Sequence, residues 1–455
     1  MRITERVPRV LARIPNIIRG SLGSRVMSVP RRRPAALLLA AAASMGCLAE
    51  RPRVARPRPA PAEAQARLAH DPSALHRSLD HYDFATHPEL LQRIAASPFQ
   101  YFRFTNPGFA AAICSAFEDI LPALPAVNLH GDAHLEQFAV TDTSFGLVDF
   151  DDAVGGPAVI DLLRFGVSLR IAARQRGWTA DEALDRFFAG YQAALEDPAT
   201  EAPIPAFVGR ARQSFPRDPD RFLASCDALM EPLPPGDRAE ADAGLKRYID
   251  VMLEQRPELT RAFFETKRDG RLRGGVGSAL DQRFLVRVEG PTPAQDDDVV
   301  LEAKELRDLS SVPCVQAGLL GGRFRTIVGR ARLGGNDDPF LALVPRGPEE
   351  TADDPPFWVQ SWQPDYRELD AAHDLTSADE LDQVAYQVAL QLGRGHIRQF
   401  ATPFDDQLRR AVRDMLRDYG PRIRATIDDM TERTLASWQH FRDEAGRAEA
   451  ARDAP

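Results

Sequence analysis

The stretch 127–150, VNLHGDAHLEQFAVTDTSFGLVDF, decides how this chain of 455 residues is organised. Its first apolar run ends at His130, and a polar loop follows. Two further apolar runs, 138–140 and 145–148, flank a Thr-Asp-Thr-Ser turn, which is the pattern of a β-hairpin. The sequence therefore predicts a loop that leads directly into a hairpin.

Three aspartates, Asp149, Asp151 and Asp152, follow the hairpin in close succession. Clustered carboxylates repel one another, so they need a cation, hydrogen bonds or full solvation. A solvated acidic turn would explain the three aspartates alone. Because the sequence His-Gly-Asp-x-His lies just upstream, at 130–134, we expect the two segments to form one chemical site.

The motif His-Gly-Asp-x-His-x-x-Gln at 130–137, followed by Val-Asp-Phe-Asp at 148–151, resembles the catalytic loop and metal-binding aspartate of the aminoglycoside and choline kinase-like phosphotransferases. In finer detail the chain resembles the uncharacterised bacterial family named domain of unknown function 2252, over about residues 83–418. Four segments carry this finer resemblance, at 95–99, 130–138, 149–157 and 161–164.

The resemblance implies roles for the loop. Asp132 would accept the proton of an attacking hydroxyl group or orient it, and His130 and His134 would complete the catalytic group. Asp161 would tie the loop to the helix that follows.

The resemblance also implies a cofactor, Mg²⁺ with ATP. Asp149 would hold the metal, since hard cations prefer carboxylate oxygen, and Asp151 would assist. Gln137 lies where both families place asparagine as a second metal ligand, and its extra methylene leaves that position open.

The second half of a kinase-like site needs a glycine-rich turn and a strand lysine, and both follow downstream. The turn contains Gly275, Gly277 and Ser278. Taken alone, such a turn is also typical of an ordinary hairpin connection. Lys304 ends the run Val-Val-Leu-Glu-Ala-Lys and is one of only three lysines in the chain. The alternative interpretation of Lys304 is a lysine at a strand edge that pairs with Glu302 or Glu305.

These positions predict an α+β, protein-kinase-like fold of two lobes that is circularly permuted. The catalytic-loop lobe (71–235) comes first, the strand-rich lobe of the glycine turn and lysine (236–350) second, and a helical segment (351–450) completes the largely helical catalytic lobe. If so, the Lys304 ammonium should lie within about 4 Å of Asp149 or of the metal between them.

The first 47 residues are expected to be a leader with a lipoprotein-type signal. Three arginines precede an apolar run at 35–43, which ends near Cys47, the expected lipidation site. Met27 would start a leader of ordinary length. Residues 48–70, rich in proline, arginine and alanine, are typical of a linker. The protein is therefore expected in the cell envelope, lipid-anchored or periplasmic, or in the cytoplasm if the leader is not functional.

The composition is that of a globular protein, with 44% hydrophobic residues and a formal net charge of −9, so nucleic acid is not an expected partner. Four cysteines are too few for a disulfide scaffold. Cys114, Cys226 and Cys314 are expected to be small buried residues, and His396 a core or capping histidine.

Three functions remain open. The first is a phosphotransferase acting on an unknown small-molecule or protein acceptor. The second is a non-catalytic, kinase-like envelope lipoprotein that serves as a binding module, which Gln137 and the missing third glycine favour. The third is a metal-dependent hydrolase that uses His130, Asp132 and His134 as ligands.

Overall fold

The computed structural model describes residues 75–452, apart from positions 78, 80–81, 83, 85–86, 273–275, 277–281, 308, 310, 317–324, 335–337, 346–355 and 400–401. Contacts divide the chain into 1–59 and 60–455, and every described residue belongs to the second unit. The leader with Cys47, the linker, and Gly275, Gly277 and Ser278 of the glycine turn lie outside the described residues.

The described chain is a mixture of helices and short strands, which confirms the α+β class. Its helices are α2 (Pro88–Ala96), α3 (Pro98–Phe104), α4 (Asn106–Ala116), α5 (Val159–Gln175), α6 (Asp181–Glu196), α7 (Ala206–Gln213), α8 (Pro219–Ala228), α9 (Pro235–Gln255), α10 (Arg325–Leu333), α11 (Ala378–Ile397) and α12 (Thr402–Arg452). Its strands are β1 (Ala126–Leu129), β2 (Phe138–Thr141), β3 (Phe145–Leu147), β4 (Val154–Pro157), β5 (Met230–Glu231), β6 (Thr266–Leu272), β7 (Arg283–Val288), β8 (Val299–Glu305), β9 (Ala342–Val344), β10 (Phe357–Trp362) and β11 (Tyr366–Glu368).

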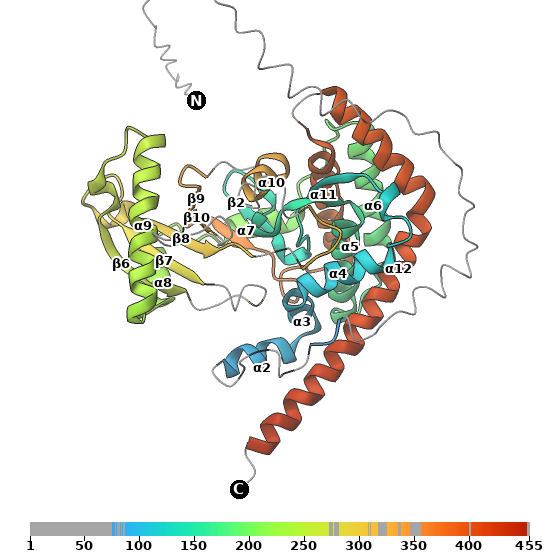
Figure 1. Cartoon of the computed structure of the whole chain (residues 1–455), viewed down its shortest axis with the longest axis horizontal. Coiled ribbons are helices and arrows are strands. Elements are labelled where there is room, and N and C mark those ends of the chain that lie inside the picture. The colour runs from blue at the N-terminus through green and yellow to red at the C-terminus, as the bar shows by residue number, and fades with distance from the viewer. Residues whose placement is uncertain are drawn as a thin grey trace, which may run out of the picture. The chain divides into compact units, whose positions relative to one another are not determined.

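Within the described residues, the largest sheet has six antiparallel strands in the order β5-β6-β7-β8-β10-β9. The run around Lys304 forms β8, as expected, and it lies between β7 and β10. Alternate apolar residues of these strands, such as Phe284 and Leu301, pack against Tyr248 and Met252 of α9, which lies across one face of the sheet (Figure 1). Strand β10 belongs to this sheet, although its residues follow position 350.

A second core is built from helices of two distant parts of the chain. In α5, nearly every residue is buried, from Val159 to Ala173. Helix α11 packs along α6, and α12 packs along α5 (Figure 1). The apolar face predicted over 381–392 is buried in α11, whose first turn is capped by the Ser377 side chain accepting from the Glu380 N–H. None of the helices in the described part of the chain is both long enough and apolar enough to cross a bilayer.

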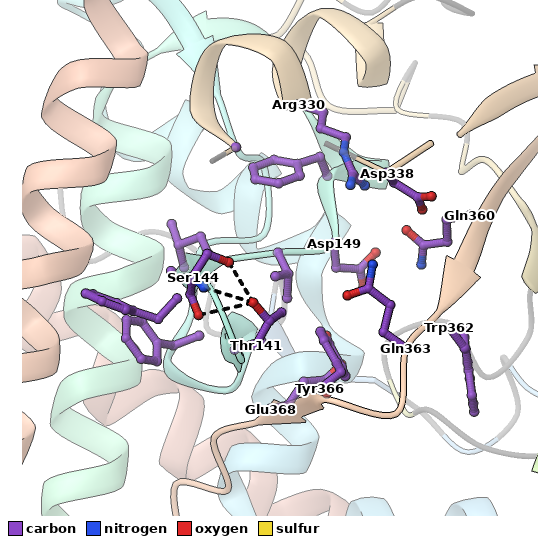
Figure 2. A pocket seen from close by; sticks show the side chains of 18 of the residues that line it. Thr141, Ser144, Asp149, Arg330, Asp338, Gln360, Trp362, Gln363, Tyr366 and Glu368 are labelled. Carbon is purple, nitrogen blue, oxygen red and sulfur yellow. Dashed lines mark hydrogen bonds between the residues drawn. The ribbon is translucent and has the colours of Figure 1, made fainter. Parts of the chain in front are cut away.

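The predicted hairpin is present. Strands β2 and β3 pair antiparallel, and β11 adds to the other edge of β2. The turn is closed by hydrogen bonds between Thr141 and Ser144, drawn as dashed lines in Figure 2. The apolar residues of the hairpin, Phe138 and Leu147, are buried in the helical core.

A disulfide bond joins Cys114 of α4 to Cys314, 200 positions later. The expectation that both are merely small buried residues is therefore wrong. The two cysteines are far apart in the sequence and show no local spacing that would predict the bond. They meet because packing brings α4 next to the segment that follows β8. Cys226 is buried and unbonded, as expected, and burial raises the pKa of its thiol to about 11.

Candidate functional site

A cavity of about 750 Å³ lies between the six-stranded sheet, the β2–β3 hairpin and helices α10 and α11. Its volume is within the range of small-molecule sites. The sheet contributes Lys304 and Gln360, the hairpin end contributes Asp149, and the chain after β10 contributes Gln363. Figure 2 shows the side chains of Asp149, Gln360 and Gln363 pointing into the same space.

The ammonium of Lys304 lies among carboxylates from a segment 155 residues earlier. Its Nζ is 3.2 Å from Asp149 Oδ1 and 3.3 Å from Oδ2, and 2.5 Å from Asp151 Oδ2. The expected proximity of Lys304 and Asp149 is therefore confirmed. Burial alone would lower the pKa of Lys304, but the two carboxylates raise it, so the side chain is charged.

Asp149 faces the cavity, with about 35% of its side chain exposed. Its backbone is left-handed, with φ of 59°, a conformation that costs most residues energy and is concentrated at functional sites. Burial would raise the pKa of this carboxyl, but the charge of Lys304 lowers it. Gln137 Nε2 donates to Asp149 Oδ2 at 3.5 Å, so two of the three residues expected to hold a metal are neighbours.

Asp151 does not line the cavity. Its side chain is only 4% exposed and contacts Lys304. Burial, together with the charge of Asp149, raises the pKa of this carboxyl. The expectation that Asp151 assists in metal binding therefore finds no support in this geometry, because Lys304 occupies its accessible oxygen.

The alternative pairing for Lys304 is not the one observed. Glu302 accepts from Arg283 Nε at 2.8 Å and from Trp362 Nε1 at 2.9 Å. Burial opposes its ionisation, yet the charges of Arg283 and Lys304, with the hydrogen bond from Trp362, hold the pKa of Glu302 at about 2. Glu302 is thus a fixed anion in the wall of the cavity, and Lys304 is left to the aspartates.

Asp161 binds the catalytic loop as expected. Its carboxylate accepts from the backbone N–H of His130 at 2.6 Å and from that of Gly131 at 2.9 Å. On its other side, Asp161 lies 3.0 Å from His396 Nε2, and the His396 ring meets the Tyr191 hydroxyl at 2.7 Å. His396 is therefore the core histidine predicted, and it joins α11 and α6 to the loop.

Asp132 is held by an arginine that the loop motif alone does not reveal. Arg164, at the end of the Asp-Leu-Leu-Arg segment, donates to Asp132 Oδ1 through Nε at 2.9 Å. Both side chains are almost fully buried, and Asp132 is not among the residues that line the cavity. Burial opposes ionisation, but Arg164 and His134 hold the pKa of Asp132 far below its usual range.

The two loop histidines are structural in this arrangement. His130 is buried, and its Nε2 lies 2.8 Å from the Val148 carbonyl. His134 is also buried, against the rings of Phe99 and Phe102, and burial lowers its pKa to about 4. Among the described residues, His130, Asp132 and His134 do not bring three metal-ligating atoms within 4.8 Å of one another.

Besides Arg283 of β7, four further arginines line the cavity. They are Arg330 and Arg332 of α10, Arg394 of α11, and Arg398 just after it. Burial lowers the pKa of Arg332, and the nearby charge of Arg398 adds to this effect. Carboxylate and guanidinium groups therefore both line this cavity, and the guanidinium groups suit a ligand with an anionic part.

Two further arginines, both missed by motif reasoning, hold the aspartate segment in place. Arg325 donates to the backbone carbonyls of Asp151 at 2.5 Å and Ala153 at 2.9 Å. Arg307 donates to Asp152 Oδ2 at 2.8 Å. In a chain with so many arginines, composition could not have distinguished these two from surface residues.

Comparison with known proteins gives a limited result. No curated protein and no solved structure matches the chain. Residues 85–212, which include the catalytic-loop motif, Asp149 and Arg164, match a family model. That family is described as an uncharacterised protein conserved in bacteria, the domain of unknown function 2252, and the match supports the family expected from the sequence.

Proposed function

We propose that the protein is a kinase-like, Mg²⁺-dependent phosphotransferase, or a nucleotide-binding relative of one, acting on an unidentified acceptor. The observation that supports this most is the ion pair of Lys304 with Asp149 in the wall of a 750 Å³ cavity. In protein kinases a strand lysine contacts the phosphates and an aspartate of the same site holds Mg²⁺, so the two residue types found here suit phosphoryl transfer.

The residues present fit a magnesium nucleotide. Asp149 offers carboxylate oxygen atoms to the cavity. Gln137, which is not among the lining residues, donates its amide N–H to this carboxylate. Oxygen donors of this kind suit Mg²⁺, which neutralises charge on phosphate oxygens when it is bound. Lys304 would contact the phosphates as a compact positive charge, while Asp151 would keep it oriented from behind.

A binding module without turnover is the second candidate, and Asp132 favours it. To accept a proton, this carboxylate would have to give up its hydrogen bonds to Arg164. A carboxylate whose pKa lies far below its usual range is a weak base. Asp132 is also absent from the lining of the cavity and its side chain is buried, so it does not contact a ligand there in this conformation.

The disulfide bond is informative about the compartment in which the protein acts. Disulfides persist in oxidising compartments and are rare in the cytoplasm. The Cys114–Cys314 bond therefore supports our proposal of an envelope location, and a phosphate donor available there would have to be found.

The experiment is thermal melting of the full chain with and without Mg²⁺-ATP, alongside Lys304→Ala and Asp149→Asn. A ligand at 100 times its Kd adds about 2.7 kcal/mol of stability, which is a shift of several degrees. We expect a Mg²⁺-dependent shift that both variants lose, measured against each variant's own baseline. Lys267→Ala, which removes a lysine paired with Glu289 on the exposed part of the sheet, should keep it.

Two outcomes separate the candidates. ADP release that Asp132→Asn abolishes, with the thermal shift kept, would establish ATP turnover, with the phosphoryl group passing to water or to an acceptor. A shift without turnover in the native protein would establish the binding module. If neither ATP nor GTP shifts the melting temperature at millimolar concentration with Mg²⁺, the nucleotide site is refuted.

A further inference from the structure

A second cluster of ligand-type side chains lies where the start of the described chain meets the end of α12. His440 and Glu444 are on α12, and His76 comes from the segment before α2. One ligand atom from each lies within 4.8 Å of the others, and none of the three residues lines the cavity described above. We propose that His76, His440 and Glu444 bind one Zn²⁺ ion.

The separations suit that ion. Zinc binds nitrogen and oxygen at about 2.0–2.1 Å, so neighbouring ligand atoms of a tetrahedral site lie about 3.3–3.4 Å apart. His440 Nε2 is already 3.3 Å from Glu444 Oε1, because residues four apart share one face of a helix. His76 Nε2 is 3.8 Å from Glu444 Oε2, which a small side-chain rotation would close. Two histidines and a glutamate form a recognised zinc set that leaves the fourth position to water.

The segments that carry the ligands are anchored before any ion binds. The Tyr101 hydroxyl donates to the Leu75 carbonyl at 2.6 Å and accepts from the Arg77 N–H at 3.1 Å. The backbone is therefore held on both sides of His76. On α12, Phe441 is fully buried next to His440, and its ring centroid lies 5.3 Å from that of Tyr101. A site on anchored segments loses less conformational entropy when it binds.

The side chains are accessible to an ion from solvent. His76 and Glu444 are each 27% exposed, and His440 is 58% exposed. The imidazole rings of His76 and His440 lie edge to face, with centroids 4.6 Å apart. A bound ion would fasten the segment before α2 to the end of α12, where the chain enters the catalytic-loop half of the fold. The role proposed for this ion is to hold the two segments together, and it does not depend on the proposed phosphotransferase activity.

The test is calorimetric titration of the metal-stripped full chain with Zn²⁺, in an Asp149→Asn background that removes the cavity carboxylate as a competitor. We expect one equivalent of Zn²⁺, with binding at least tenfold weaker in His440→Ala and in Glu444→Gln. His373→Ala is the matched control. His373 also pairs with a carboxylate, that of Asp370 at 2.9 Å, but it belongs to no three-residue group of this kind among the described residues.

A second readout tests the structural role. Zn²⁺ should slow tryptic cleavage after Arg77, next to the ligand His76, and the protection should disappear in His440→Ala. No binding of Zn²⁺, or binding of equal strength in the His440→Ala, Glu444→Gln double variant, would overturn the proposal. Binding that leaves the cleavage rate at Arg77 unchanged would overturn the fastening role.

Discussion

Replacing Lys304 with methionine should destabilise the protein at neutral pH, because methionine keeps the apolar stem but removes the ammonium from two carboxylates. Breaking a buried ion pair by deleting one partner costs about 3–5 kcal/mol. The side chains of Lys304 and Asp151 are 5% and 4% exposed. Asp149, at 35% exposed, can regain water. We therefore expect the low end of that range, about 3 kcal/mol at pH 7.5.

The stability lost in Lys304→Met should become smaller as the pH falls. The pKa of Asp151 is already raised in the folded protein, and it rises further without Lys304. Asp149, whose pKa Lys304 lowers in the native protein, loses that effect in the variant. The folded variant then takes up protons at a higher pH than the unfolded chain, so acidification favours its folded state. At pH 5 we expect the difference from the native protein to fall to about 1 kcal/mol.

Urea unfolding of both proteins at pH 7.5 and pH 5 measures the effect. Lys267→Met is the control, because that lysine is 35% exposed and pairs with Glu289. An exposed pair contributes less than about 1 kcal/mol at either pH. A cost below about 1 kcal/mol for Lys304→Met at pH 7.5, or a cost that does not change with pH, would refute the buried cluster.

Three other predictions follow from single contacts. Cys114→Ser should lower the free energy of unfolding by about 2–5 kcal/mol, since it removes a disulfide that closes a loop of 200 residues. Thiol titration of the denatured native protein should find two fewer thiols before reduction than after it. Gly131→Ala should lower the free energy of unfolding by at least about 2 kcal/mol, because φ is +84° and the new Cβ would lie 2.0 Å from the Asp152 carbonyl oxygen; unchanged urea unfolding would contradict this strain. Burial, with Glu182 and Asp379 nearby, raises the pKa of Asp382 to about 6. Native stability should therefore fall as the pH rises from about 4 to about 6, and Asp382→Asn should gain about 1–2 kcal/mol at pH 7.5 and little at pH 4.

The local elements could be predicted from the sequence by itself. The hairpin at 138–147 follows from two apolar runs around a polar turn, and the helical tail from an apolar face repeated over 381–392. The Lys304 strand follows from a short, mainly apolar run at 299–304. These features depend on neighbours a few residues apart, so the order of residues contains them. The meeting of Lys304 with Asp149 was also predictable, but only through the resemblance that named both as parts of one site.

Only the tertiary structure decided which groups face the cavity and which are already paired. Asp149 and Asp151 are two positions apart and look alike in sequence, yet a left-handed turn at Asp149 directs one to the cavity and leaves the other behind Lys304. The Arg164 partner of Asp132 and the Cys114–Cys314 bond likewise depend on elements that meet through packing. Such contacts join residues tens to hundreds of positions apart, and a local pattern contains no information about which distant side chain will fill the space beside it.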